Sequence, residues 1–283
     1  MLTRLLFLFS LVLGSTILLT GAWTGSLTLP TPNSEIHFVP QAIQLDADII
    51  GSGIDAKQLL QKALEKLDPK RTPWLKTKIR QTMTDKNLNF IAHGYLQRGP
   101  NHCARLELNL GKHGCFLVVS DGEVMAQVCK IPGAAPTVEV THLPIPPDDS
   151  KVDAEALKEG YLDDKSCGGP GELLRQLHRD LGDSRLQTGL LQQSPVIQIH
   201  GNLNPTSKKS DTFSANSACH ACVYLDAKTL WPVRLEWWGA EKATLPSRPI
   251  LCIEFLEPVI NCVLSGEECM RTFSYRPDGQ SSQ

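Results

Sequence analysis

The sequence is poor in aromatic residues and has no marked excess of charge of either sign. Aromatic side chains make up 6% of the 283 residues, and 28 lysines and arginines against 30 aspartates and glutamates give a formal net charge of −2. Proteins that bind nucleic-acid polymers usually present a basic surface, so we expect no nucleic-acid partner. A hydrophobic content of 41% is typical of a chain that folds around a core.

The motifs of common enzyme sites are also missing. The eight histidines show no metal-ligand spacing, and no Gly-x-Ser-x-Gly nucleophile turn is present. The stretch from Gly51 to Ala56 matches a loose dinucleotide-binding pattern, but the segment before it carries two aspartates, which better fits the entry to a helix. We therefore predict no metal, no cofactor and no enzymatic activity.

Long apolar runs are absent except at the N-terminus. Residues Leu5–Leu19 carry no charge, Arg4 precedes them, and small residues follow at Thr20 and Ala22. This pattern predicts export, with residues 1–22 either a cleaved signal peptide or a retained membrane anchor. We expect a periplasmic protein or one anchored in the inner membrane facing the periplasm, with a tether over residues 23–54 and a folded domain over 55–280.

Strand patterns outnumber helical ones in the expected domain. Asp55 and Gln58 form a capping box for a helix that ends at Asp68-Pro69, a second short helix is expected over 73–83, and a third over 171–181. About eleven strands fill the remainder, including a closing one around residues 271–275, with no alternation of strand and helix. The pattern predicts an α+β protein with an antiparallel sheet.

Nine cysteines are many for this length, and an exported location would permit disulfides. An odd number leaves at least one thiol free or paired with another chain. The Asp121-Gly122 dipeptide is a strong hairpin signal and would bring Cys115 opposite residue 128 or 129. Either a Cys115–Cys129 disulfide or two neighbouring reduced thiols fits this register.

Cys219 and Cys222 lie two residues apart and raise the alternative of a thiol–disulfide oxidoreductase. A reactive dithiol usually begins a helix, whereas a strand follows here. A zinc site needs a second ligand pair, which Cys252 and Cys262 do not supply at suitable spacing. We interpret the pair as the start of a β-hairpin, with the thiols serving packing or a disulfide.

Several short motifs together resemble the LolA-like group of bacterial envelope proteins, including exported planctomycete members. They are GYLQRGP, VVSDGEVMAQV, VYLDAKTLWPVRLEW and FSYRPDG, with matching positions at Gly94, Leu96, Pro100, Asp121, Gly122, Asp226, Pro232, Phe273, Tyr275, Pro277 and Gly279. The resemblance implies a strongly curved antiparallel sheet, an incomplete barrel, with helices over its concave face. LolA-like proteins hold lipoprotein acyl chains in that concavity.

The more apolar side of each expected strand is the candidate ligand face. Its residues are Leu106, Leu108, Leu117, Val119, Leu235, Trp237, Ile253 and Phe255. We expect a non-enzymatic envelope protein that binds a lipid, an acyl chain or another apolar ligand, with a lipoprotein carrier as one form of it and the membrane as a partner of the N-terminal segment. An anchored scaffold whose sheet and helices form a packed core remains the alternative.

Overall fold

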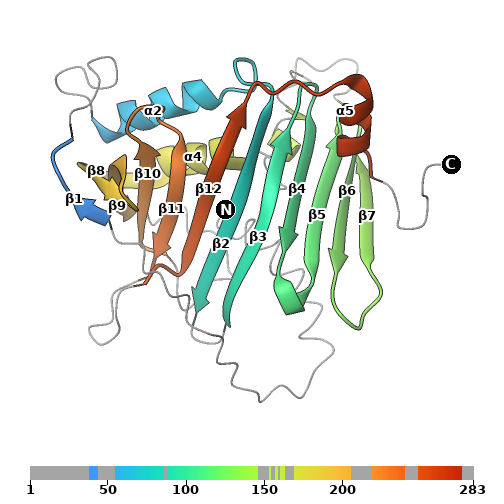
Figure 1. Ribbon diagram of the computed structural model, residues 1–283, viewed down its shortest axis with the longest axis horizontal. Helices are drawn as coiled ribbons and strands as arrows, with labels where there is room; N and C mark the ends of the chain where they lie inside the picture. Colours follow the sequence, from blue (N-terminus) through green and yellow to red (C-terminus); the bar gives the residue numbers. More distant parts are fainter. Residues whose placement is uncertain are drawn as a thin grey trace. The chain divides into compact units, whose positions relative to one another are not determined.

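The computed structural model describes residues 38–43, 55–85, 88–145, 153, 157–158, 160–162, 169–204, 218–239 and 248–275. Its strands form a twelve-stranded sheet in the order β1-β8-β9-β10-β11-β12-β2-β3-β4-β5-β6-β7 (Figure 1). The strand pairs of defined register are antiparallel. The order begins at β1 and ends at β7, so the sheet is open. The predicted α+β class with an antiparallel, incomplete barrel is confirmed, with twelve strands in place of about eleven.

The elements follow one another as one run of strands interrupted by helices. The strands are β1 (Phe38–Pro40), β2 (Leu75–Asp85), β3 (Leu88–Arg98), β4 (Cys103–Asn109), β5 (Cys115–Asp121), β6 (Val124–Lys130), β7 (Thr137–His142), β8 (Leu181–Leu191), β9 (Ser194–Leu203), β10 (His220–Asp226), β11 (Pro232–Trp238) and β12 (Leu251–Ile260). The helices are α2 (Ala56–Leu67), α4 (Gly169–Asp180), α5 (Gly266–Phe273) and the short 3-10 helix η1 (Gly111–His113).

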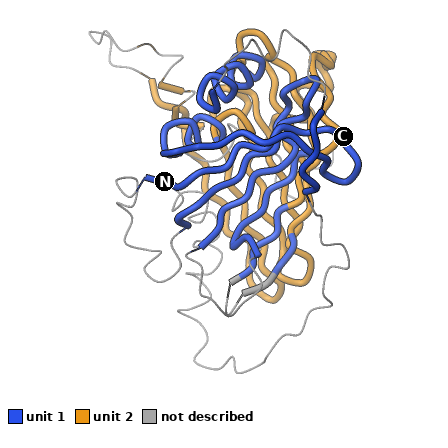
Figure 2. The backbone as a smooth tube through the Cα atoms, turned by 90° about the vertical axis from the view of Figure 1, so that its left-hand side faces the viewer, with its two compact units in different colours: residues 1–67, 81–91, 173–255 blue, residues 68–80, 92–172, 256–283 orange. Residues whose placement is uncertain are grey.

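The chain forms two compact units, each assembled from three separate stretches (Figure 2). Unit 1 comprises residues 1–67, 81–91 and 173–255, and unit 2 comprises residues 68–80, 92–172 and 256–283. Strands β2, β3 and β12 each contribute one part to unit 1 and another to unit 2. Strands β8 to β11 belong wholly to unit 1, and β4 to β7 to unit 2.

Helix α2 begins where the sequence predicts. The Asp55 carboxylate accepts a hydrogen bond from the Gln58 backbone N–H at 2.8 Å, and the Gln58 side chain accepts one from the Asp55 N–H at 3.3 Å. This reciprocal pair satisfies donors that a helix start otherwise leaves unpaired. The face with Leu59, Leu60 and Ala63 is completely buried. The expected helix over 171–181 is confirmed as α4, which begins two residues earlier.

The short helix expected over 73–83 is wrong, because this stretch forms strand β2. The apolar residues Leu75 and Ile79 fit helical spacing, yet every second residue of the stretch is buried, including the polar Thr77 and Gln81. The Thr77 hydroxyl donates a hydrogen bond to the Leu256 carbonyl at 2.9 Å, which offsets the cost of removing the hydroxyl from water. Because two of the buried positions are polar, the alternation of buried and exposed residues that marks a strand was not visible in the sequence.

The closing strand expected around 271–275 is also wrong, because helix α5 occupies residues 266–273. Ser265 caps this helix: its hydroxyl accepts from the Glu268 N–H, and the Glu268 carboxylate accepts from the Ser265 N–H at 2.9 Å. The sequence analysis missed this capping box. Phe273, counted as a strand residue, is 1% exposed and packs beside Gly99 and Trp74.

Both expected hairpins are confirmed. Strands β5 and β6 meet at Asp121-Gly122, where Gly122 has a φ of +96° and the Asp121 carboxylate accepts from the Val124 N–H at 2.8 Å. The turn between β10 and β11 is held by Asp226, whose carboxylate accepts from the Thr229 N–H and hydroxyl, both at 2.7 Å. An acidic residue that binds the backbone two or three positions ahead is a strong turn former.

Part of the segment expected to be a tether belongs to the sheet. Residues 38–40 form the edge strand β1, which pairs with β8. The Phe38 ring lies over Gly189, where a Cβ atom would come within 2.4 Å of it. The predicted signal peptide or anchor, residues 23–37 and 44–54 of the expected tether, Cys167, Pro277 and Gly279 lie outside the described residues. Within the described ranges, no helix is long and apolar enough to cross a membrane.

Candidate functional site

Unit 1 carries a continuous apolar face on strands β9 to β12. The register places Ile199, Val223, Leu235 and Ile253 in one row across the four strands. Directly opposed residues share a face, and each of these side chains is at most 4% exposed. Neighbouring rows add Ile197, Leu225, Ala221, Trp237, Leu251 and Phe255, which are equally buried. The four candidate residues of this unit, Leu235, Trp237, Ile253 and Phe255, are thus brought together.

Helical side chains share this burial. Leu59 and Leu60 of α2 and Leu174 of α4 are 0% exposed, and α2 packs against β8. At its C-terminal end, α2 is held by Lys66, whose Nζ donates to the Thr229 carbonyl in the β10–β11 turn at 3.1 Å. Nearby, the Trp231 ring meets Phe255 edge-on and donates its Nε1–H to the Phe255 carbonyl at 3.1 Å.

Unit 2 has an apolar face of its own, but the four candidate residues of this unit do not all lie on it. Two lie on one side of the sheet and two on the other. Leu106 lies opposite Val118 and Leu108 opposite Phe116, whereas Leu117 and Val119 lie opposite Glu107 and Arg105. The expected alignment of Leu117 and Val119 with Leu106 and Leu108 is therefore wrong. In β5 both alternating sets are apolar, Phe116 with Val118 and Leu117 with Val119, so apolarity alone does not decide which set shares a face with Leu106 and Leu108.

The register also corrects the proposed pairing of Cys115 and Cys129. Cys115 lies opposite Lys130, and Cys129 lies opposite Phe116, one residue further along than expected. Adjacent strand residues point to opposite faces, so the two thiols lie on different sides of the sheet. Both are free in the structure. The β5–β6 loop is responsible, because Ser120 pairs with Met125 and four residues intervene.

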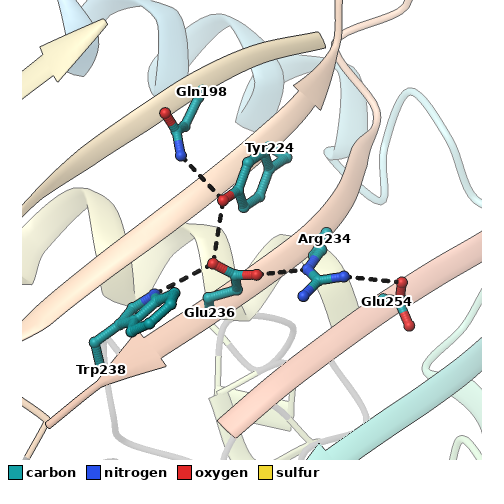
Figure 3. Close-up of polar contacts among 6 residues, drawn as sticks. All are labelled: Gln198, Tyr224, Arg234, Glu236, Trp238 and Glu254. Carbon is teal, nitrogen blue, oxygen red and sulfur yellow. Dashed lines mark hydrogen bonds and ion pairs between the residues drawn. The ribbon is translucent and has the colours of Figure 1, made fainter. Parts of the chain in front are cut away.

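The reverse face of unit 1 holds a buried polar network, centred on Glu236 (Figure 3). One Glu236 carboxylate oxygen accepts from the Tyr224 hydroxyl at 3.1 Å and from the Trp238 indole N–H at 3.2 Å, and the other pairs with Arg234 Nε at 2.6 Å. Arg234 Nη1 reaches Glu254 at 3.5 Å. Gln198 donates to the Tyr224 hydroxyl at 3.0 Å, so the polar network links β9, β10, β11 and β12.

Nearly complete burial distinguishes this network. The side chains of Arg234, Glu236 and Glu254 are 11%, 5% and 6% exposed. Removing such charges from water is costly, and pairing with several hydrogen bonds is needed to offset that cost. Burial, followed by the Glu236 charge, raises the pKa of Tyr224. The hydroxyl therefore stays protonated and donates to the carboxylate. Strand alternation puts Arg234 and Glu236 on the face opposite Leu235, as observed, but it does not indicate that they are buried.

A similar but more exposed group lies in unit 2. Arg105 and Glu107 of β4 pair at 3.0 Å, and the Tyr95 hydroxyl of β3 donates to Glu107 at 2.6 Å. Arg105 Nη1 also donates to the Thr272 carbonyl in α5 at 3.2 Å. The Arg105 and Glu107 side chains are 22% and 40% exposed. This contact fixes α5 beside the face of β4 that carries Arg105.

Cys219 and Cys222 have the geometry of the hairpin interpretation. Cys219 directly precedes β10, and its thiol lies 3.8 Å from the Trp238 carbonyl; Cys222 is buried inside the strand. Burial, followed by the Glu236 charge, raises the pKa of the Cys222 thiol to about 12. A reactive dithiol needs a lowered pKa. Among the described residues, no group of three or more His, Cys, Asp or Glu side chains is placed to hold a metal ion.

Solved structures of similar fold come from bacterial proteins. The lipoprotein LppX of Mycobacterium tuberculosis is 15% identical with a TM-score of 0.42, and the match covers 74% of this chain and 97% of that one. LprF of Mycobacterium bovis is 10% identical with a TM-score of 0.36, and the match covers 74% of this chain and 94% of that one. A LolA superfamily protein of Nitrosomonas europaea is 9% identical with a TM-score of 0.28, and the match covers 76% of this chain and 97% of that one. A LolA superfamily protein is thus among the matches.

No protein-family model matches the chain, and no curated protein matches it. The TM-scores lie below 0.5 and the identities at or below 15%. These structures therefore assign neither a ligand nor a residue role to this chain.

Proposed function

We propose that this chain is a non-enzymatic protein of the bacterial envelope that binds an apolar ligand, a lipid or an acyl chain, on the apolar face of unit 1. The observation that carries the proposal is the segregation of side chains on β9 to β12. One face is apolar in the row from Ile199 to Ile253 and in the neighbouring rows. The polar and charged groups lie on the other face.

Ligand binding on a buried face requires helix side chains to give way. The side chains of this face are at most 4% exposed, so a guest must take the place of leucines of α2 or α4. Exchange of one apolar contact for another changes the buried apolar area little, so the free-energy cost of the exchange is small. The helix contacts would be replaced by ligand contacts.

The polar network on the reverse face supports such an exchange. The hydrogen bonds and ion pairs described above all join residues of four neighbouring strands. Strands β9 to β12 can therefore keep their register while a helix moves away from their apolar side. A sheet that is fixed from one face is suited to bind different partners on the other.

The finer form of the proposal is a carrier that takes up and releases its ligand in the periplasm. The uncharged run Leu5–Leu19 would direct export, as a cleaved signal peptide or as an inner-membrane anchor. The motifs shared with LolA-like proteins agree with the acyl chain of a lipoprotein as the ligand class. N-terminal sequencing of the protein recovered from envelope fractions distinguishes cleavage from anchoring.

A fluorescent fatty acid titrated into the purified chain tests ligand binding directly. We expect saturable binding, and native mass spectrometry of protein extracted from membranes should show co-purified lipid. Leu235→Trp fills the centre of the apolar face and should weaken binding at least tenfold, a result measured on protein whose folding is checked by circular dichroism.

Val196→Trp is the matched control. Val196 is 1% exposed but packs with Tyr224 and Cys222 on the reverse face. Overpacking at either position destabilises by roughly 1–3 kcal/mol, so a general loss of stability affects both variants alike. Equal loss of binding in both, or no lipid uptake by the unaltered chain, would favour the packed scaffold over the proposal.

Leu108→Trp extends the same test to unit 2. Leu108 lies on the apolar face of β4, opposite Phe116. If the ligand also contacts unit 2, binding should weaken with little change in melting temperature. If Leu108 belongs to a packed core, the melting temperature should fall instead, and binding to unit 1 should persist in the fraction that remains folded.

A further inference from the structure

Helix α5 lies against β4 and β5 and buries one side chain. It packs on these two strands in unit 2 (Figure 1). Most of its residues are exposed, and Phe273 is its fully buried side chain. The Arg105–Thr272 hydrogen bond of 3.2 Å joins its last turn to β4. A helix of eight residues is too short to be stable by itself, so its position depends on such tertiary contacts.

Two cysteines stand next to that hydrogen bond, one on each element. Cys103 precedes Arg105 by two residues in β4, so the two side chains point to the same face. Cys269 precedes Thr272 by three residues in α5, which places both on one side of the helix. Both thiols are free in the structure. Burial raises the pKa of the Cys103 thiol, and Cys269 lies close enough to raise it further.

We propose that Cys103 and Cys269 form a disulfide bond that fastens α5 to β4. The bond forms when the two thiols lose two protons and two electrons to a disulfide-bonded oxidant, whose own S–S bond is reduced to two thiols. An exported chain meets oxidants of this class. The inference is independent of ligand binding by unit 1, because both cysteines belong to unit 2.

Reduced Cys103 is a poor nucleophile once α5 is in place. Its side chain is 9% exposed and its thiol lies 3.4 Å from the Asp121 carbonyl. Burial, followed by the neighbouring Cys269, raises the pKa of Cys103 to about 12. Thiol–disulfide exchange requires a thiolate. The bond therefore forms most readily while the chain folds, and it resists reduction after α5 has docked.

Peptide mapping of the unaltered chain tests the pairing. The reduced, unfolded protein is refolded in a buffer containing oxidised glutathione, free thiols are blocked, and the chain is cleaved with trypsin and a glutamate-specific protease. We expect residues 99–105 to be linked to residues 269–271. Blocked thiols at both positions, or a link from Cys103 to a different cysteine, would overturn the proposal.

Melting temperatures supply a second readout with matched variants. A bond that closes so long a loop should raise the melting temperature by about 10 °C. Reduction should therefore lower the melting temperature of the unaltered chain and of Cys115→Ser by the same amount, and leave that of Cys269→Ser unchanged. Cys115 lies in the same unit without such a partner helix. An equal drop in Cys269→Ser would contradict the proposed bond.

Discussion

The tripeptide Arg-Leu-Glu occurs once in each unit, as residues 105–107 of β4 and 234–236 of β11, and each copy is joined by a tyrosine from the preceding strand. In both, the tyrosine hydroxyl donates to the glutamate and the arginine pairs with it. The copy in unit 2 is partly exposed, whereas that in unit 1 is buried and extended by Gln198, Trp238 and Glu254.

The difference shows that identical local sequences can have different energetic roles. An exposed ion pair contributes at most about 1 kcal/mol, because water solvates its members almost as well as they solvate each other. A buried one contributes little net stability, but removal of one member leaves a charge without compensation. The glutamate of unit 1 is therefore far more sensitive to the loss of its arginine than that of unit 2.

Replacement of each arginine by methionine should give the largest contrast. Arg234→Met deprives the buried Glu236 and Glu254 of this cation and should lower the free energy of unfolding by about 3–5 kcal/mol. Arg105→Met should lower it by about 1 kcal/mol. Urea unfolding of both variants measures the difference, and similar losses would show that exposure does not separate the two copies.

A triple variant separates lost charge pairing from lost packing. Adding Glu236→Gln and Glu254→Gln to Arg234→Met removes the two carboxylate charges that Arg234 contacts while keeping the side-chain shapes. More than half of the lost stability should return. No recovery would indicate that Arg234 acts through packing contacts of its long side chain.

Removal of the tyrosine hydroxyls should give a smaller contrast of the same sign. Tyr224→Phe takes one hydrogen bond from a buried carboxylate and leaves Gln198 without its acceptor, at a cost of about 1.5–3 kcal/mol. Tyr95→Phe affects a carboxylate that water can reach, at a cost of about 0.5–1 kcal/mol. Thermal unfolding monitored by circular dichroism provides the comparison, in which Tyr95→Phe as the more harmful change would reverse our expectation.

The exposed copy should also respond to acid. Burial alone would raise the pKa of Glu107, but the hydrogen bonds from Tyr95 and Arg105 outweigh it and hold the pKa below its ordinary value of 4.5. Its contribution to stability is therefore present above pH 4.5 and is lost as the pH falls through the lower pKa of the folded state. Because Glu107 is 40% exposed, this contribution should stay below about 1 kcal/mol.

Glu107→Gln tests this pH dependence. The variant should lose stability relative to the unaltered chain at pH 7, and the gap should close as the pH falls below 4.5, as measured by urea unfolding at each pH. A gap that widens in acid would mean that the folded state favours the protonated carboxyl.

The smallest effect is expected at a fully solvated pair. Lys78 of β2 and Glu257 of β12 lie 2.6 Å apart, with side chains 62% and 67% exposed. Lys78→Ala should change the free energy of unfolding by less than about 0.5 kcal/mol. A loss above 1 kcal/mol would mean that exposure is a poor guide to the ranking of these ion pairs.

Most of the fold was predictable because its signals are local. The Asp55 capping box, the Asp121-Gly122 turn and the Asp226 turn each depend on residues within four positions of one another. The errors arose where the structure of a segment depends on residues far away in the sequence. β2 buries Thr77 because the carbonyl of Leu256, far along the chain, accepts a hydrogen bond from its hydroxyl. Alternation alone had no means of supplying that partner.

The candidate site was predictable by half. Apolar alternation identified Leu235, Trp237, Ile253 and Phe255 as one face, which the register brings together. It gave no indication that Glu236 is buried, because a charge in an alternating strand is usually solvated. A useful signal was present in the sequence: opposite charges two residues apart in β11, with a tyrosine in the neighbouring strand. That arrangement permits burial of both charges.

The short strand β1 has a mechanical consequence. It pairs with β8 through three residues, supported by the Phe38–Tyr224 ring contact at 5.8 Å and the hydrogen bond from Gln41 N–H to the Thr188 carbonyl at 3.1 Å. A pulling force applied to the chain just before Phe38 acts on these few hydrogen bonds, which break before the longer β8–β9 pairing. Release of residues 38–43 adds up to roughly 20 Å of chain. Strand β1 would therefore detach at a lower force than the rest of the sheet, so that β8 to β12 stay folded under moderate tension.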